Sequence, residues 1–412
     1  MSDGFTGLSG VPRRRLRPDP WSLGAAAIAV LVVMPIVAVI WFALTPTANI
    51  WPHLLATTLP RYLGNTVLLM VGVGILCAAI GTGAAWLVVM YRFPGQGVLQ
   101  WALLMPLAVP AYVGAYALVD FLEYAGPVQV ALRGTFGWVD ARDYWFPAIR
   151  TRGAAVLVLS AALYPYVYIL ARAAFREQSG AGYEVARALG VGPWGRFLRV
   201  GLPLARPAIA AGAAVAMMET VNDFGTVSFF AVQTLTTGIF SVWLQGGNLG
   251  GAAQIAVSVL VLIVALVTLE KQSRRRSKSY GSARGSRPVT PARLTGWRGW
   301  AMTGACLLPF LAGFVLPVGV LASHAAGVSV WVAPGLGLAL FHTVVVGGVA
   351  AVLTVAGGLF MVYGVRLSGR ALPRRLMPVT APCWAWGYWC RWRPWTTGWR
   401  TVWWPCSVSI RA

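Results

Sequence analysis

Long apolar stretches separated by short polar loops run through most of this chain. A membrane-crossing helix needs about 20 mostly apolar residues, and eight stretches are of that order. The fifth of them is interrupted by polar groups. The stretches are Leu23–Leu44, Leu63–Met90, Leu99–Phe121, Ala154–Ala174, Pro207–Phe230, Ala252–Leu269, Trp300–Leu321 and Leu338–Val365. The pattern predicts an all-α fold, a polytopic transmembrane helix bundle of about eight spans.

The distribution of Lys and Arg predicts the orientation of the spans, because cytoplasmic loops are enriched in basic residues. The basic segment 1–20 has a cluster of arginines, namely Arg13, Arg14, Arg15 and Arg17. Alternation from a cytoplasmic N-terminus places the loop 177–206 and the linker 271–298 inside. That linker has nine Lys or Arg and no Asp or Glu, whereas the external loop Ser323–Gly337 has no Lys or Arg.

Composition and charge agree with a membrane protein. The chain is 58% hydrophobic and 11% charged, whereas a soluble domain has about 25% charged residues. Its net charge of +22 raises the question of nucleic-acid binding. The basic residues lie beside the spans, however, where anionic lipid headgroups attract them. We therefore expect contact with the lipid bilayer and no nucleic-acid partner.

One polar and basic loop, 177–206, has a distinctive internal pattern. Residues 184–189 have helix-forming composition, and Gly190 suits the left-handed position after a helix C-terminus. A second short helix can begin near Pro193, since Pro is favoured in the first helical turn. Pro203 and Pro207 then mark the entry to the next span. The loop is predicted to form a stiff helix–turn–helix elbow at the membrane surface.

The spacing within this loop resembles the cytoplasmic coupling loop of ABC-transporter permeases. Glu184-Val-Ala is followed by Gly190 and then by Val200-Gly-Leu-Pro203, with Val185 and Val200 as mild departures from Ala and Ile. The resemblance implies a type I ABC importer permease fold, in which a cytoplasmic ABC ATPase dimer docks on the loop. The residues that would carry docking are Glu184, Ala186, Gly190, Leu202 and Pro203.

Two further segments resemble ferric-iron permeases of bacterial binding-protein-dependent systems. They are Asp223-Phe-Gly-Thr-Val-Ser-Phe-Phe at the end of the fifth span and Thr236-Thr-Gly-Ile-Phe after it. The resemblance implies a multi-pass protein of the bacterial inner membrane that receives ferric iron from an extracytoplasmic solute-binding protein. Thiamine, polyamine and phosphonate permeases belong to the same wider group and are alternatives.

The chain contains signs of an internal repeat. Asn65-Thr-Val opens the second span and His342-Thr-Val lies near the start of the eighth. Residues 21–270 are therefore interpreted as a complete permease unit of six spans, and residues 299–375 as the first two spans of a second unit. The basic linker 271–298 separates them.

Residues 376–412 differ in composition from the rest of the chain. The last 32 residues hold eight of the 20 Trp and three of the five Cys. Because Trp has the single codon TGG, a one-base shift converts each Trp codon into part of an apolar codon, and Trp384-Ala385 and Trp386-Gly387 then each give an apolar residue followed by Gly. The hypothesis is a frameshift, or a sequencing error, that truncates a longer permease. The alternative is a genuine interfacial aromatic tail, and resequencing distinguishes them.

Several kinds of chemistry are absent from the sequence. A P-loop requires a Lys after a Gly-rich turn, and neither Lys271 nor Lys278 has that context. We therefore expect no catalytic residues and no directly bound cofactor, with ATP used by a partner subunit. There is no CxxC pair, and the three histidines are scattered, so no metal site is predicted.

Polar residues near the end of the fifth span suggest a translocation path. Glu219 and Asp223 are four residues apart with Asn222 between them. Ionisable residues at membrane depth are costly and usually face a cavity or a partner, and carboxylate oxygens suit a hard cation. The alternative is that these groups cap the helix or pair across the bundle.

Two rival functions belong to other classes. A secondary transporter would need no ATPase, and it does not account for the coupling-loop spacing. A truncated chain with one coupling loop could also be a membrane scaffold or a non-functional remnant.

Overall fold

The computed structural model describes residues 20–46, 52, 54–276, 289–327 and 335–368. These residues are helical apart from loops and one pair of two-residue strands. The chain divides into two compact units, one formed by Met1–Ala38 with Pro334–Ala412 and the other by Val39–Ala333. The predicted tail 376–412 lies outside the described residues.

Seven described helical segments are long and apolar enough to cross a membrane, and a bent helix pair brings the total to as many as eight. This confirms the prediction of an all-α membrane bundle. The seven segments are α1 (Pro20–Leu44), α3 (Leu59–Met90), α7 (Arg152–Glu177), the run ending in α10 (Leu202–Asn222), α13 (Leu249–Arg276), the run from α14 (Trp297–Phe310) to α15 (Leu316–Gly327), and α16 (Leu336–Ser368).

The third predicted span, Leu99–Phe121, is not one straight helix. It comprises α4 (Gln96–Ala102), the 3₁₀ turn η2 (Met105–Ala108) and α5 (Ala111–Leu122), and the run is bent by 93° between Ala108 and Ala111. Proline is the cause, since Pro110 forces the preceding Val109 out of the helical region, to φ −107° and ψ 117°. Hydrophobicity averaged along the sequence does not reveal such a bend, because both arms of the bent span are apolar. The short helix α6 (Pro127–Phe136) follows α5.

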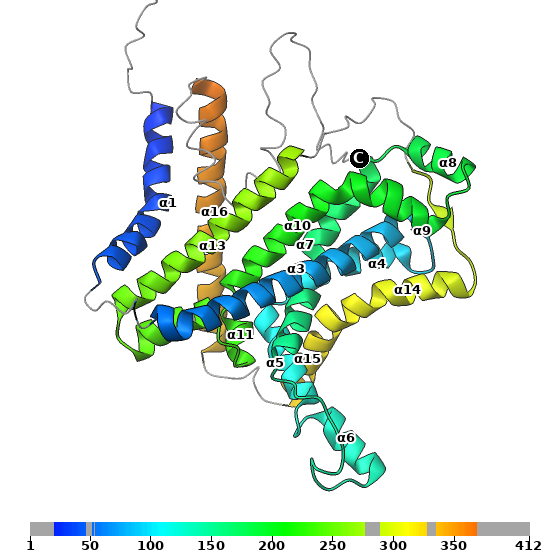
Figure 1. Ribbon diagram of the computed structural model, residues 1–412, viewed down its shortest axis with the longest axis horizontal. Coiled ribbons are helices and arrows are strands. Elements are labelled where there is room, and N and C mark those ends of the chain that lie inside the picture. Colours follow the sequence, from blue (N-terminus) through cyan, green and yellow to red (C-terminus); the bar gives the residue numbers. More distant parts are fainter. Residues whose placement is uncertain (1–19, 47–51, 53, 277–288, 328–334, 369–412) are drawn as a thin grey trace, which may run out of the picture. The chain divides into compact units, whose positions relative to one another are not determined.

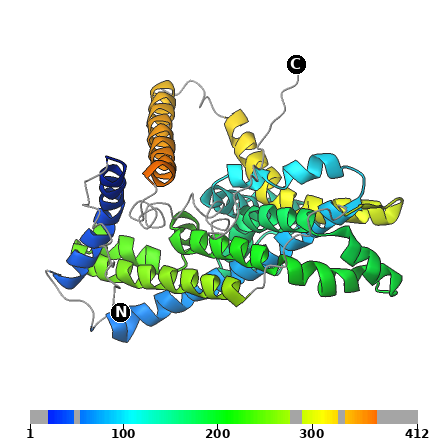
Figure 2. The same ribbon diagram turned by 90° about the horizontal axis from the view of Figure 1, so that it is seen from above.

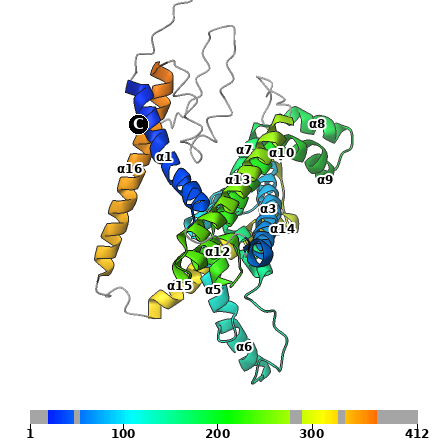
Figure 3. The same ribbon diagram turned by 60° about the vertical axis from the view of Figure 1, so that its left-hand side comes forward.

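The core of the larger unit lies between α3, α7 and α10, which run side by side in Figures 1 and 3. Small residues allow this close approach. A Cβ on Gly81 of α3 would lie 2.8 Å from the Tyr164 carbonyl oxygen of α7, and one on Gly212 of α10 would lie 2.6 Å from the Val167 Cα. The backbones therefore touch, and large side chains such as Tyr164 and Tyr168 fill the spaces beside the contacts.

The fifth span also differs from its prediction. Its helix α10 ends at Asn222, and the polar segment that follows contains the short helices α11 (Gly225–Phe229) and α12 (Leu235–Phe240), with the π-helical turn η4 (Ser241–Gln245) after them. The sixth span, α13, extends to Arg276 and so includes the start of the predicted linker 271–298.

The seventh span packs within the larger unit. The strands β1 (Tyr91–Arg92) and β2 (Ala292–Arg293) pair in parallel, and the Thr303 hydroxyl donates to the Pro94 carbonyl at 2.7 Å. Beyond α14, the π-helical turn η5 (Leu311–Val315) leads into α15, which contacts α5. Figures 1 and 2 both show these yellow helices beside the cyan segment of α4 and α5.

In the smaller unit, α1 contacts α16. The rings of Trp21 and Phe360 lie 4.9 Å apart between centroids, tilted by 33°. Gly24 lies against the same Phe360 ring. The first and last described helices of the chain are therefore partners, as Figure 3 shows.

Candidate functional site

The loop after α7 forms the predicted elbow. Its first arm is α8 (Gly180–Ala188), and Gly190 follows with φ of +75°. The Val191 amide donates to the Ala186 carbonyl at 2.9 Å, and the Gly190 amide donates to the Arg187 carbonyl at 3.0 Å. These two bonds form a Schellman motif, which satisfies the last carbonyls of the helix. The predicted left-handed C-terminal glycine is confirmed.

The second arm begins with α9 (Pro193–Arg196) at the predicted proline. It continues without a break through the π-helical turn η3 (Phe197–Gly201) into α10. Pro203 lies in the first turn of α10, at the entry to the span as predicted, and the helical run continues through it. Pro203 lacks an N–H and its ring crowds the preceding turn, and the wider turn η3, closed by the Leu202 amide donating to the Phe197 carbonyl, lies directly before it.

The inner face of the elbow rests on one tryptophan of α3. Trp86 is 9% exposed, and its ring centroid lies 5.4 Å from Phe175, 5.9 Å from Tyr183 and 5.0 Å from Phe197. Gly201 of η3 also faces this ring. Burial raises the pKa of Tyr183, so its hydroxyl stays protonated and donates to the side-chain oxygen of Gln178.

The outer face of the elbow is exposed and apolar. Leu189 is 77% exposed, Trp194 is 70% exposed and Val185 is 60% exposed. Glu184 and Arg187 are exposed as well, whereas Ala186 is buried. Leu202 and Pro203 are half-buried in the first turn of α10. The structure thus brings Glu184 and Gly190 together in the elbow and places Leu202 and Pro203 where α10 begins.

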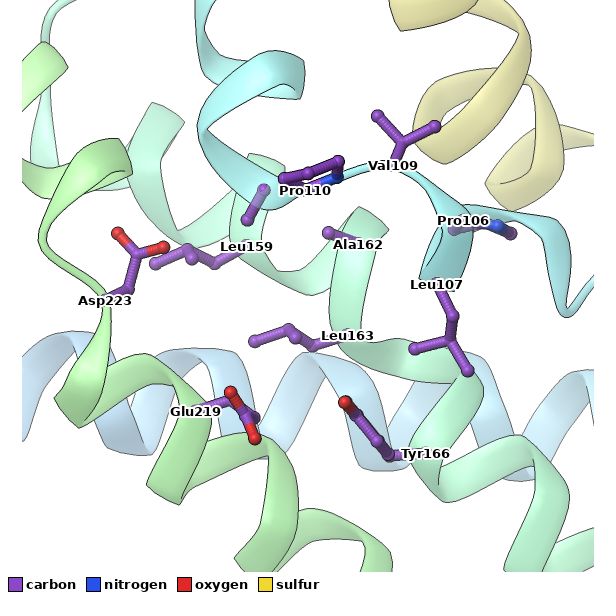
Figure 4. A pocket seen from close by; sticks show the side chains of 11 residues that line it. Pro106, Leu107, Val109, Pro110, Leu159, Ala162, Leu163, Tyr166, Glu219 and Asp223 are labelled. Carbon is purple, nitrogen blue, oxygen red and sulfur yellow. The ribbon is translucent and has the colours of Figure 1, made fainter. Parts of the chain in front are cut away.

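The larger unit also contains a cavity of about 190 Å³ between α7, α10 and the bent third span. The kinked segment contributes Pro106 and Pro110 to its wall, and α7 contributes Tyr166. Non-helical backbone at membrane depth is tolerated where it is buried in protein or lines such a space. Figure 4 shows Glu219 and Tyr166 directed towards the same space from α10 and α7, with Asp223 at its far side.

The three predicted path residues have different positions. Glu219 and Asp223 line the cavity, but Asn222 is exposed and is absent from the lining. Asp223 lies just after α10 and caps α11, since its carboxylate accepts from the Thr226 amide at 2.8 Å and the Thr226 hydroxyl at 3.0 Å. Asp223 therefore caps the helix that follows and also faces the cavity, whereas its place on a translocation path stays a prediction.

Sequence reasoning missed Trp86 and Tyr166. Each lies inside a long apolar span, where an aromatic residue carries no signal of its own. Only the packing of α3 and α7 distinguishes them from neighbouring aromatic residues. No three His, Cys, Asp or Glu side chains in the described parts of the chain are grouped so that they could hold a metal ion.

Comparison with known proteins identifies the family that this chain matches. Residues 70–278 match the family described as "Binding-protein-dependent transport system inner membrane component". The Fe(3+)-transport system permease protein FbpB 2 of Haemophilus influenzae is 28% identical over 223 residues, which are 54% of this chain and 39% of that protein. The molybdenum transport system permease protein ModB of Escherichia coli is 28% identical over 197 residues, 46% of this chain and 82% of that protein.

Solved structures show the same fold. In the crystal structure of a bacterial alginate ABC transporter in complex with its alginate pentasaccharide-bound periplasmic protein, one chain matches with a TM-score of 0.51 and 18% identity. The match covers 62% of this chain and 93% of that chain. At this identity the likeness establishes the type I permease fold alone.

Proposed function

Since this chain belongs to the family of binding-protein-dependent transport system inner membrane components, we propose that it is the permease subunit of an ATP-driven ABC importer. It is a multi-pass protein of the inner membrane, with its N-terminus in the cytoplasm. A separate cytoplasmic ABC ATPase dimer docks on the elbow, and an extracytoplasmic solute-binding protein delivers the cargo. The chain itself hydrolyses no ATP.

The shape of the elbow is the observation that carries this proposal. The elbow exposes the large apolar side chains of Val185, Leu189 and Trp194, together with the charged side chains of Glu184 and Arg187. Exposed apolar groups gathered in one segment are typical of a protein–protein contact. The inner face of the elbow is fixed on Trp86. A docked partner would therefore push on a rigid body rather than on a flexible loop.

The proposed cargo is ferric iron, and the cavity supports a cation. Two carboxylates and one phenol are the ionisable groups among the 11 side chains that line it, which include no Lys, Arg or His. Carboxylate oxygens suit hard cations such as Fe³⁺, whereas an oxyanion beside two carboxylates would be repelled. This favours the cargo named for the Haemophilus relative over the cargo named for the molybdenum relative.

The proposed mechanism is alternating access. Closure of the ATPase dimer displaces the elbow, and α10 connects the elbow to the cavity because it begins beside η3 and carries Glu219 three residues before its end. The cavity opens to one side of the membrane at a time, and the cargo is released because two carboxylates form no closed metal cage.

Uptake of radioactive iron tests the proposal. The chain is expressed with ATPase and binding-protein partners from its own genome in cells that lack ferric import, and iron, molybdate and sulfate uptake are compared. We expect ATP-dependent iron uptake alone. Glu184→Ala should reduce ATPase co-purification and uptake at least about tenfold, as removal of a central contact residue does. Glu177→Ala, at the exposed last residue of α7 and before the first arm of the elbow, should not.

The cavity carboxylates are tested in the same assay. Asp223→Asn keeps a helix-capping side chain while removing the charge, and Glu219→Gln removes the other charge. We expect the double variant to lose iron uptake while ATPase co-purification persists. Uptake at the unmodified rate would exclude Glu219 and Asp223 from the translocation path.

A further inference from the structure

The two ends of α3 hold different functional segments of the larger unit. We propose that α3 is a strut that couples the elbow to the external segment 231–237 beside the cavity, with Trp86 as its positioning residue. This proposal rests on the proposed function, since it assigns a transmission route to the same docking loop. Figure 1 shows α8 and α9 near one end of α3 and α11 near the other.

At the elbow end, one side chain contacts the end of α7 and both arms of the loop. The Trp86 ring meets Phe175 at the end of α7, Tyr183 of α8 and Phe197 of η3. A Cβ on Gly201 would lie 2.5 Å from this ring, so only glycine fits there. The elbow cannot move relative to α3 without breaking these buried contacts.

A hydrogen-bonded bridge closes the elbow on itself. The Tyr183 hydroxyl donates to the side-chain oxygen of Gln178, and the Gln178 side-chain amide donates to the Gly201 carbonyl at 3.2 Å. The bridge joins the first arm to the π-helical turn in the second arm. A force applied anywhere on the outer face therefore reaches Trp86 through one connected body.

At the other end, α3 holds the external segment by two hydrogen bonds. The Asn65 side-chain amide donates to the Gln233 carbonyl at 2.8 Å, and the Leu235 amide donates to the Thr66 hydroxyl at 3.0 Å. Leu235 is fully buried. The next residue, Thr236, donates its hydroxyl to the Asp223 carbonyl at 3.1 Å. The segment thus links α3 directly to a residue of the cavity wall.

The helix between these anchors is suited to transmit displacement. Trp86 and Thr66 are about 30 Å apart along the axis at 1.5 Å per residue, and the only proline of α3 is in its first turn. The alternative route through α10 contains Pro207 and begins at the π-helical turn η3, and both features make a helix easier to bend. A stiff helix packed on α7 cannot absorb a shift locally.

Hydrogen exchange in the full chain, held in lipid nanodiscs without cargo or ATPase, tests the strut. Trp86→Ala should increase exchange about tenfold or more both in residues 178–201 and in residues 231–237, because loss of the anchor raises local opening at each end. Trp86→Phe should restore slow exchange in both segments. Faster exchange in residues 178–201 alone would overturn the proposal.

The reciprocal variant keeps the test valid if Trp86→Ala does not fold. Thr66→Val removes the hydroxyl that holds Leu235 while preserving side-chain shape, and Thr66→Ser preserves the hydroxyl. Coupling between two sites is mutual, so Thr66→Val should accelerate exchange in residues 178–201 as well as in residues 231–237. A purely local effect would contradict the strut. Neither exchange measurement depends on cargo. A failure of the iron-uptake test would therefore leave the test of the strut unaffected.

Discussion

The roles of some single residues in this protein could be predicted from the sequence, and the roles of others could not. Gly190 was predictable because a left-handed position after a helix has few alternatives, and φ of +75° confirms it. Trp86 and Tyr166 were not, since an aromatic residue in an apolar span has the same neighbours in sequence whether it faces lipid, core or cavity. Asp223 was found as a polar residue, but its cap on α11 depends on where α10 ends.

Replacement of Gly190 tests whether the elbow needs a residue that adopts a positive φ at this position. A Cβ at Gly190 meets no atom within 4 Å, so Gly190→Ala acts only through its positive φ, at a cost of about 1 kcal/mol. We expect a lower affinity for the ATPase, by about fivefold at that cost, in a binding titration. Gly192→Ala is the matched control, because Gly192 is equally open and has φ of −64°. Equal effects of the two changes would contradict this reason.

At the level of helices, hydropathy predicted the spans but not their bends or contacts. Seven of the eight predicted stretches correspond to described long helices or helical runs. The third is bent by 93°, because Pro110 forces Val109 out of the helical region. The average hydrophobicity of the segment does not reveal this effect. Nor could hydropathy indicate which face of α3 meets α7. That contact depends on glycines whose neighbours are distant in sequence.

Two glycines of α3 provide a test of this contact. A Cβ on Gly81 would lie 2.8 Å from two backbone atoms of α7, whereas one on Gly83 would meet nothing within 4 Å. Gly81→Ala should therefore separate the helices and destabilise the chain by about 1–3 kcal/mol, as overpacking does. Gly83→Ala should leave the melting temperature unchanged or slightly higher. Thermal unfolding of the purified protein in nanodiscs measures both, and equal melting temperatures would disprove the contact.

For the whole molecule, the sequence predicted a six-span unit followed by two spans of a second unit. That division stays a prediction, and the compact units of the structure follow other boundaries. The seventh span contacts α4, α5 and α7 of the larger unit, while α1 contacts α16. Matching motifs can reveal an internal repeat, but they do not indicate which spans pack against one another.

Cleavage of the chain tests the place of the seventh span. A protease site introduced within residues 277–288 separates the first six spans from the rest. We expect both fragments to remain together on affinity purification, because β2, Thr303 and α15 all contact the first fragment.

Gly313 provides the matched pair for this experiment. Its Cβ position is occupied by the Ala161 carbonyl and Pro106, whereas that of Gly304 is open. Gly313→Leu should release the second fragment, and Gly304→Leu should retain it. Separation of the fragments in the unmodified chain would show that the seventh span is not held by the first six.

The contact of the seventh span has a consequence for biosynthesis. Gly313 lies against Pro106, which also lines the cavity, so this wall gains its outer support only when residues near 313 have been made. At about 5–20 residues per second, the ribosome produces that segment about 10–40 s after α5. During this interval the nascent protein must wait in the membrane with an uncovered helical surface. Insertion factors that shield such surfaces would therefore influence its yield more than its final stability.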